Sequence, residues 1–364
     1  MLKWIIFVLL LTKNPITKNP VVEFTLANNK IYSDINLDLS FKEKIEKIIQ
    51  IQDEFFVKKA KPYNIFLINS SSNSQFKGTT KSAHIIVAGN FSTNNNESIR
   101  VIAHELVHRY IGNIILQNKD HELEYKWFFE GFTEYLAVQS LLHSKFINDL
   151  EYLNIINDTL EKYFNSPLND IRFDKIQKHH MKDKQISIMS YYKGFIIAFI
   201  LDEKIKEKTN NNCSIKCFLN ELILTTTSNN YVFEISIFQE ILKHYLSVGY
   251  VEQILSSINN PKILENLLPK KVFNNRYLVK RYIDQYQTCF NLSKTLESRF
   301  IHGIEHNSDC YQKGLRNGQI LTCYSINYAT GIINLGISCT KNSKKTIKIK
   351  AIKKSHSIPS YNFN

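Results

Sequence analysis

The segment between Val101 and His108 contains the pattern His-Glu-x-x-His, and it constrains the fold of this chain more than any other feature. Residues four apart on an α-helix lie on one face, so the side chains of His104 and His108 can both reach one metal ion. Glu105 lies beside them, where its carboxylate can act on a water molecule bound to that metal. The remaining residues are apolar, so the segment predicts a largely buried helix that binds zinc.

The alternative is an amphipathic helix that carries two histidines without binding a metal. A second helical segment, from Trp127 to Ala137, argues against this alternative because Glu130 can supply a third ligand. An unpaired carboxylate among aromatic neighbours would be costly, whereas two histidines, one carboxylate and a water form an established catalytic zinc set. Glu134, one helical turn further on, can accept a hydrogen bond from a ligand histidine and fix its orientation.

A long apolar helix is predicted between Met189 and Asp202, and two tyrosines open it. A tyrosine hydroxyl close to the metal can donate a hydrogen bond to the oxyanion that forms on an attacked carbonyl group. Buried tyrosines are also common in helix packing. The local sequence alone therefore favours a packing role for Tyr191 and Tyr192.

The three segments together resemble the gluzincin metallopeptidases, and most closely the glycyl aminopeptidase family, whose members often carry a C-terminal PDZ domain. The resemblance rests on three sequence motifs and on their order along the chain: AHELVH, WFFEGFTEYLA and SYYKGFIIAFILDEKI. The aminopeptidase N family shares this skeleton, but the interval before the glutamate and the Gly-Phe-Thr wording favour the glycyl aminopeptidase side. The resemblance implies that one zinc ion is bound by His104, His108 and Glu130, with Glu105 as general base.

The resemblance also implies that Tyr191 donates a hydrogen bond to the oxyanion. Tyr192 is the alternative donor, because this chain has one residue fewer between the tyrosine pair and the lysine than the family usually has. Exopeptidases of this group hold the substrate amino group with a carboxylate from a Gly-x-Met-Glu-Asn or Gly-Gly-Leu-Glu segment. The matching stretch here, residues 76–87, has no acidic residue, which argues against strict aminopeptidase activity.

Residues 83–87 predict a strand, and we expect it to form the sheet edge along which a substrate backbone lies. An ordinary strand inside the sheet fits these residues equally well. The residues expected at this substrate edge are Ser82, Ala83, His84 and Ile85.

The predicted fold class is α+β. We expect a thermolysin-like gluzincin catalytic domain over residues 21–294, with a small β-sheet, the zinc helix and then a helical half. The glycine pattern changes after about residue 295. The wording between Ser308 and Leu321 resembles a PDZ segment in which a short helix ends at a glycine before a strand, so residues 295–364 predict a small β-rich PDZ-like module.

The chain begins with one lysine in an apolar run, which has the shape of a short secretory signal. We expect residues 1–20 to be a signal peptide or an N-terminal anchor, and the protein to be secreted, periplasmic or membrane-associated; a cytoplasmic location is the alternative. Such a terminus would allow peripheral membrane association. The six cysteines permit disulfides, but the sequence does not choose their pairing.

The formal net charge of +13 raises the question of a nucleic-acid partner. The lysines are scattered and accompany no nucleic-acid motif, so we expect no nucleic-acid partner. The predicted function is zinc-dependent hydrolysis of peptide bonds in a peptide or protein substrate, aminopeptidase-like in its site. A non-catalytic peptide-binding or scaffold protein on a peptidase fold is the alternative. The sequence predicts no oligomeric state.

Overall fold

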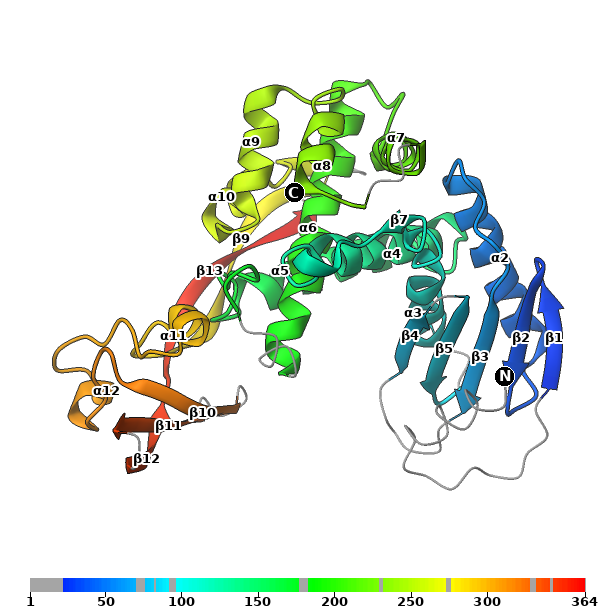
Figure 1. Ribbon diagram of the computed structural model, residues 1–364. Helices are drawn as coiled ribbons and strands as arrows, with labels where there is room; N and C mark the ends of the chain where they lie inside the picture. Colours follow the sequence, from blue (N-terminus) through cyan, green and yellow to red (C-terminus); the bar gives the residue numbers. More distant parts are fainter. Residues whose placement is uncertain are drawn as a thin grey trace. The chain divides into compact units, whose positions relative to one another are not determined.

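The computed structural model describes residues 22–69, 76–81, 83–91, 96–176, 183–228, 232–272, 276–327, 332–340 and 343–363 (Figure 1). The expected signal peptide or anchor and Ser82 lie outside these residues. The chain divides into two compact units. The first comprises residues 1–110 and 137–146, and the second comprises residues 111–136 and 147–364.

The first unit contains a five-stranded sheet with the strand order β1-β2-β3-β5-β4. The inner pairs β2/β3 and β3/β5 are parallel, and the outer pairs β1/β2 and β4/β5 are antiparallel. Alternate residues of the inner strands are buried, as expected for strands that pack one face on a core. The elements of this unit are β1 (Val22–Leu26), β2 (Asn29–Ser33), α2 (Leu39–Phe55), β3 (Asn64–Asn69), β4 (Lys77–Lys81), β5 (His84–Gly89) and α3 (Asn96–Val107).

The predicted position of the sheet edge was wrong. His84 and Ile85 begin β5, which pairs with β3 on one side and β4 on the other, and Ala83 lies in the turn before it. Among the described residues the edge strand on this side is β4. The physical reason is visible in the composition. The apolar β5 is enclosed by two neighbours, whereas the polar Lys-Gly-Thr-Thr-Lys sequence of β4 suits the edge of the sheet.

Polar contacts inside the first unit fix α3, which carries His104 and ends directly before His108. The buried Gln52 of α2 donates from its Nε2 to the carbonyl oxygen of Ala103, at 3.0 Å. At the end of α3, the buried Arg109 donates to Asp53 Oδ1 at 2.9 Å, and the Tyr110 hydroxyl donates to the same oxygen. Because each contact joins α2 to the metal-binding end of α3, the two helices form one rigid support.

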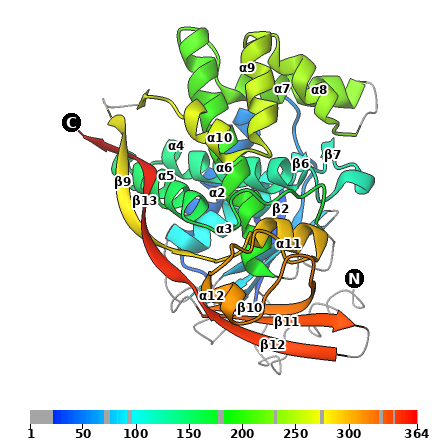
Figure 2. The ribbon, with the colours of Figure 1, turned by 90° about the vertical axis from the view of Figure 1, so that its left-hand side faces the viewer.

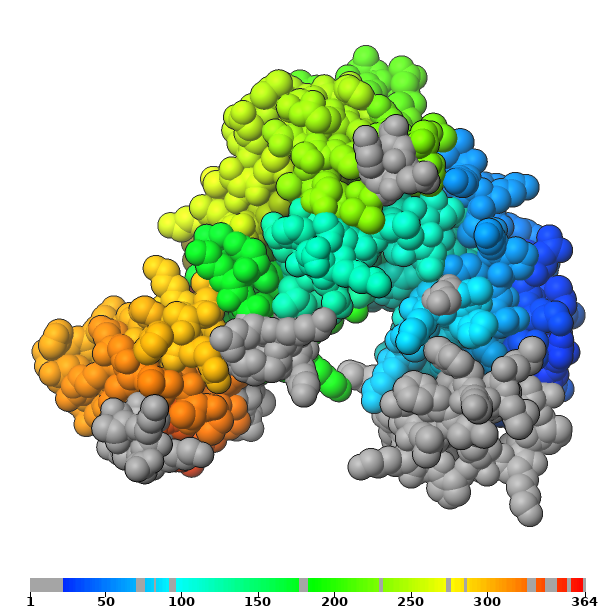
Figure 3. Space-filling view, viewed as in Figure 1, coloured from blue at the N-terminus to red at the C-terminus, as the bar shows by residue number. Residues whose placement is uncertain are grey.

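Helices make up most of the second unit, as the sequence predicts. Asn148 caps α5 with both halves of a capping box, and Asn260 caps α10 with a proline at the first helical position. Helices α9 and α10 form a continuous surface in Figure 3. The elements are β6 (Ile111–Gly112), β7 (Ile115–Leu116), the 3₁₀ helix η1 (Lys119–His121), the π-helix η2 (Trp127–Phe132), α4 (Thr133–His143, which continues into the first unit), α5 (Asp149–Phe164), α6 (Lys184–Lys208), α7 (Ile215–Ser228), α8 (Ile235–Leu242), α9 (Val248–Ser257) and α10 (Pro261–Leu267).

The last part of the second unit is rich in strands. β10, β11 and β12 form an antiparallel sheet, and β13 pairs antiparallel with β9 along its whole length (Figure 2). Gly314 and Gly318 have positive φ angles between the short helix α12 and β10. The elements are β8 (Lys271–Val272), β9 (Arg276–Gln287), α11 (Leu292–Ser298), α12 (Asp309–Gln312), β10 (Ile320–Asn327), β11 (Ile332–Thr340), β12 (Ser343–Lys350) and β13 (Ile352–Phe363).

The β9/β13 pair joins the two sides of the boundary predicted at residue 294, and that boundary and the PDZ-like character stay predictions. Among the described residues of the second unit, disulfides join Cys213 to Cys217 and Cys289 to Cys310. No helix within the described ranges is long and apolar enough to cross a membrane.

Candidate metal centre

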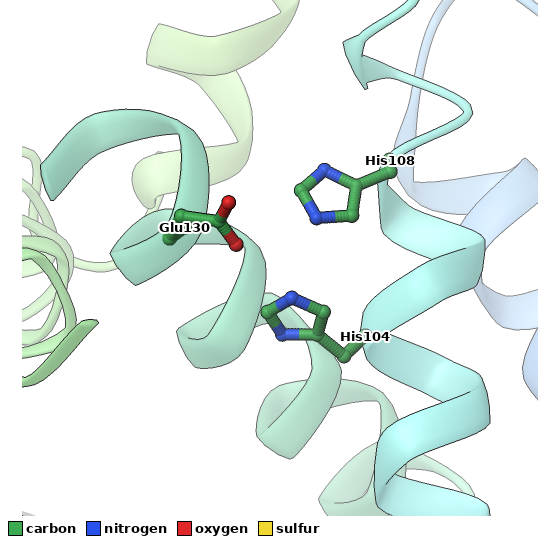
Figure 4. Close-up of side chains that lie close together, drawn as sticks. All are labelled: His104, His108 and Glu130. Atoms are coloured by element: carbon green, nitrogen blue, oxygen red, sulfur yellow. The ribbon is translucent and has the colours of Figure 1, made fainter. Parts of the chain in front are cut away.

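Three side chains predicted as metal ligands lie close together. His104, His108 and Glu130 each offer one ligand atom, and these atoms all lie within 4.8 Å of one another (Figure 4). The two imidazole rings stand nearly perpendicular, with their centroids 4.9 Å apart. Two imidazole nitrogens and one carboxylate oxygen form a donor set that suits zinc. Among the described residues this is the one such group of three metal-binding side chains.

The end of α3 sets the spacing of the two histidines. His104 lies in the last turn of the helix and is buried, and His108 follows directly after the helix ends at Val107. The chain tightens there, because Arg109 N donates to the Leu106 carbonyl at 3.2 Å and Tyr110 N donates to the Val107 carbonyl at 2.8 Å. Three-residue spacings of this kind close the last turn of a helix, so His108 stays one turn from His104.

Glu130 lies in the π-helix η2, a form that is rare and often marks functional sites. The buried Trp127, Phe129 and Phe132 flank it on the same segment. Where the helix returns to α form, the Thr133 hydroxyl donates to the Phe129 carbonyl at 2.6 Å. The wider π turn thus holds a partly buried carboxylate within an aromatic segment. The sequence gives no sign of it, because a π turn has no distinct apolar period.

Two glycines bring η2 and α6 into direct backbone contact. A Cβ atom placed on Gly194 would lie 1.7 Å from the carbonyl oxygen of Trp127, and one placed on Gly131 would lie 2.3 Å from the Cα of Gly194. Only residues without side chains allow this approach. The glycines of the Glu-Gly-Phe and Lys-Gly-Phe motifs therefore allow close packing, and this packing fixes the segment that bears Glu130 against α6.

The tyrosine pair opens the buried part of α6. Tyr191 and Tyr192 are partly exposed, and the Lys126 ammonium lies 5.9 Å from the centroid of the Tyr191 ring. Lys126 directly precedes η2, so Tyr191 lies beside the start of the segment that carries Glu130. The choice between Tyr191 and Tyr192 as hydrogen-bond donor, and the hydrogen bond predicted for Glu134, stay predictions.

Lys193 lies between the tyrosine pair and Gly194, and its ammonium is fully buried. The Lys193 Nζ donates to the Ile171 carbonyl at 3.1 Å and lies 5.2 Å from the centroid of the Phe173 ring. Burial lowers the pKa of Lys193 from 10.5 to about 8, although Asp170, Asp174 and Glu297 oppose this shift. The residue anchors the loop after α5 to α6.

The carboxylate of Glu105 is buried against the edge strand β4. The Thr80 Oγ1 lies 2.7 Å from Glu105 Oε2 and 3.0 Å from the Glu105 carbonyl oxygen. Gly78, on the same face of the strand, leaves room for the other carboxylate oxygen. Sequence reasoning missed both residues. The sequence does contain a signal for them: Gly78 and Thr80 have the two-residue spacing of one strand face, in a polar segment that directly precedes an apolar strand.

The comparisons with known proteins agree with this centre. A family model described as the peptidase family M1 domain matches residues 77–234. These residues comprise β4, the His-Glu-x-x-His helix, η2 and α6, which are the elements that build the centre. None of the curated proteins matches the chain.

Several solved structures are similar. The aminopeptidase N family protein from Idiomarina loihiensis is 16% identical, with a TM-score of 0.60 over 94% of this chain and 68% of that chain. At this identity the likeness shows the fold alone. The M1 zinc metallopeptidase from Deinococcus radiodurans is 13% identical (TM-score 0.43; 65% of this chain, 50% of that one), and the yeast LTA4 hydrolase in complex with bestatin is 16% identical (0.46; 67% and 39%). The chain thus spans half or less of the length of the last two.

The family match indicates a hydrolase of the peptidase class over residues 77–234, and the same stretch supplies a donor set that suits one zinc ion. The prediction of a gluzincin aminopeptidase relative is confirmed: the stretch at residues 77–234 corresponds to the M1 peptidase domain. The finer prediction, that the chain is more similar to the glycyl aminopeptidase family than to the aminopeptidase N family, stays a prediction, because the family model that matches describes the M1 peptidase domain.

Proposed function

We propose that this protein hydrolyses peptide bonds, with zinc held by His104, His108 and Glu130. The observation that carries the proposal is the convergence of their ligand atoms within 4.8 Å. The donor chemistry fits the metal, because two neutral imidazoles and one carboxylate leave a coordination position open for water. A zinc ion bound there would lower the pKa of its water and polarise a substrate carbonyl group.

The residues of the chain supply the proton transfers. Glu105 follows the first ligand histidine in the sequence, and its buried carboxylate would take a proton from the attacking water and deliver it to the leaving amine. The Tyr191 hydroxyl, or that of Tyr192, would donate a hydrogen bond to the developing oxyanion. Glu134 would accept a hydrogen bond from a ligand histidine and fix its orientation.

The way in which a substrate is held bears on the choice between exopeptidase and endopeptidase. The described residues of β4 and β5 include no carboxylate that could bind a free amino group. We therefore propose peptide hydrolysis that is aminopeptidase-like in its metal site but lacks an anionic amino-group anchor on this edge. A peptide substrate would add a strand to β4, since an edge strand offers unpaired backbone groups.

We also propose that the protein is exported and that residues 295–364 form a PDZ-like module beside a catalytic domain. Support for export comes from the disulfides Cys213–Cys217 and Cys289–Cys310, because disulfides persist in oxidising compartments. Support for the module comes from the three-stranded sheet of β10, β11 and β12 and the glycine turns before it. The N-terminus would allow peripheral membrane association.

Glu105→Gln tests the catalytic proposal. We expect retention of zinc and a fall in turnover on the order of 10²–10⁴-fold, because the amide cannot accept the proton. Glu97→Gln is the matched control, since Glu97 lies exposed in the first turn of the same helix. Cleavage is followed by mass spectrometry on a peptide mixture, and zinc by elemental analysis.

Full activity of Glu105→Gln would contradict the assigned base. A native protein that holds zinc but cleaves no peptide would favour the non-catalytic peptide-binding alternative. Trimming from amino termini would identify an exopeptidase, and internal cuts would identify an endopeptidase.

A further inference from the structure

We propose that Thr80 of the edge strand β4 is a positioning residue for Glu105, and that Gly78 provides the space which the Glu105 carboxylate needs. The proposal rests on the role of Glu105 as general base. Strand β4, which we expect to bind substrate, would then also orient the general base Glu105.

The first observation is the hydrogen bond. The Thr80 hydroxyl lies 2.7 Å from Glu105 Oε2, which is a short distance typical of a hydroxyl that donates to a carboxylate. The same hydroxyl lies 3.0 Å from the main-chain carbonyl oxygen of Glu105. The hydroxyl has one proton, and the shorter contact, to Oε2, is the one that favours a single rotamer of the Glu105 side chain.

The second observation is steric. A Cβ atom placed on Gly78 would lie 2.3 Å from Glu105 Oε1, 2.4 Å from its Cγ and 2.6 Å from its Cδ. Any other residue at position 78 would displace the carboxylate. Gly78 and Thr80 are two residues apart on a strand, so they lie on the same face. Gly78 lies beside Oε1 of the Glu105 carboxylate, and Thr80 lies beside Oε2.

This arrangement matters because a free glutamate is a poorly placed base. A Glu side chain has several rotamers in solution and loses this freedom only when neighbouring groups fix it. Misplacement by about 1 Å can lower a rate on the order of 10²-fold. Glu105 is 5% exposed, and the Thr80 hydroxyl gives its buried carboxylate a hydrogen-bond donor that orients the group.

The test compares Thr80→Val, which removes the hydroxyl but keeps the shape, with Thr80→Ser, which keeps the hydroxyl. We expect Thr80→Val to lower kcat on the order of 10–100-fold, with KM changed less than about threefold and zinc content unchanged. Thr80→Ser should restore kcat to within about threefold of the native value. Thr25→Val is the matched control, because Thr25 is an exposed threonine of β1, the strand at the opposite edge of the same sheet.

A second readout does not depend on activity. In crystals of the metal-free variants, Glu105 should occupy its native rotamer in Thr80→Ser and more than one rotamer in Thr80→Val. Native kcat with a single native rotamer in Thr80→Val would overturn the proposal, as would failure of Thr80→Ser to restore kcat. If the native protein cleaves no peptide, the proposed function fails, and the rotamers of Glu105 still decide whether Thr80 positions it.

Discussion

Substitution of Gly194 by alanine should disrupt the contact between α6 and η2. The added Cβ atom would lie 1.7 Å from the Trp127 carbonyl oxygen and 2.8 Å from the Cα of Gly131. Ordinary van der Waals contact begins at 3.4 Å, so the two backbones must separate by about 1.7 Å or α6 must bend. Neither partner is a flexible side chain, and the strain therefore falls on the two helices themselves.

The cost follows from two opposing terms. Replacing glycine with alanine inside a helix stabilises a protein by about 0.5–1 kcal/mol. Overpacking at a closed contact costs about 1–3 kcal/mol and at times more, and the closeness of this contact points to the upper end. We therefore expect Gly194→Ala to lower the free energy of unfolding by about 2–3 kcal/mol. Glu130 lies on the displaced segment, and metal ligands tolerate errors of only about 0.2 Å, so zinc affinity should also fall.

Gly249→Ala is the matched control. Gly249 lies in helix α9, is exposed, and an added Cβ atom there would meet no atom within 4 Å. This variant should be more stable than the native protein by about 0.5–1 kcal/mol. Urea unfolding followed by circular dichroism, together with zinc analysis, compares the two variants. The packing argument would be refuted if Gly194→Ala unfolded at the same urea concentration as Gly249→Ala and kept its zinc.

Two further predictions concern buried charges of α6. The buried Asp202 accepts hydrogen bonds from the Tyr135 hydroxyl at 2.7 Å, Lys206 Nζ at 2.7 Å and Ile215 N at 2.9 Å. The substitution Asp202→Asn should therefore lower the free energy of unfolding by about 3 kcal/mol. Urea unfolding measures this loss, and a loss no larger than that of Asp158→Asn, a change at an exposed aspartate, would contradict the prediction. The pKa of Lys193 falls from 10.5 to about 8 in the folded state, so the native protein binds fewer protons than the unfolded chain between these values. The stability of the native protein should therefore rise by about 3 kcal/mol from pH 8 to 10.5 relative to Lys193→Met, and equal pH profiles in urea unfolding would contradict the lowered pKa of the buried Lys193.

The sequence predicted which three side chains lie together because its signals are local. The four-residue spacing of His104 and His108 is a direct consequence of helix geometry, and Glu130 stands out as a carboxylate among aromatic residues. The helical half was also predictable, since its apolar period and its caps, such as Asn148, are written in short segments. The family match agrees with these features.

Other features depend on contacts that are distant in the sequence. The apolar run of β5 suited an edge or an inner strand equally, and only the pairing of β4 with β5 decides between them. Thr80 is 25 residues from Glu105, and β9 pairs with a strand at the end of the chain. The packing role of Gly194 depends on the approach of two backbones, which no local pattern encodes.

The central claim is that one zinc ion is bound by His104, His108 and Glu130, and elemental analysis of purified protein tests it most directly. The native protein should contain one zinc ion per chain, and Glu130→Ala should contain close to none after dialysis, because two histidines alone bind zinc weakly. Glu97→Ala, a loss of an exposed carboxylate on α3, should keep one zinc ion. A native protein without zinc, or a Glu130→Ala variant that keeps one zinc ion per chain, would contradict the account.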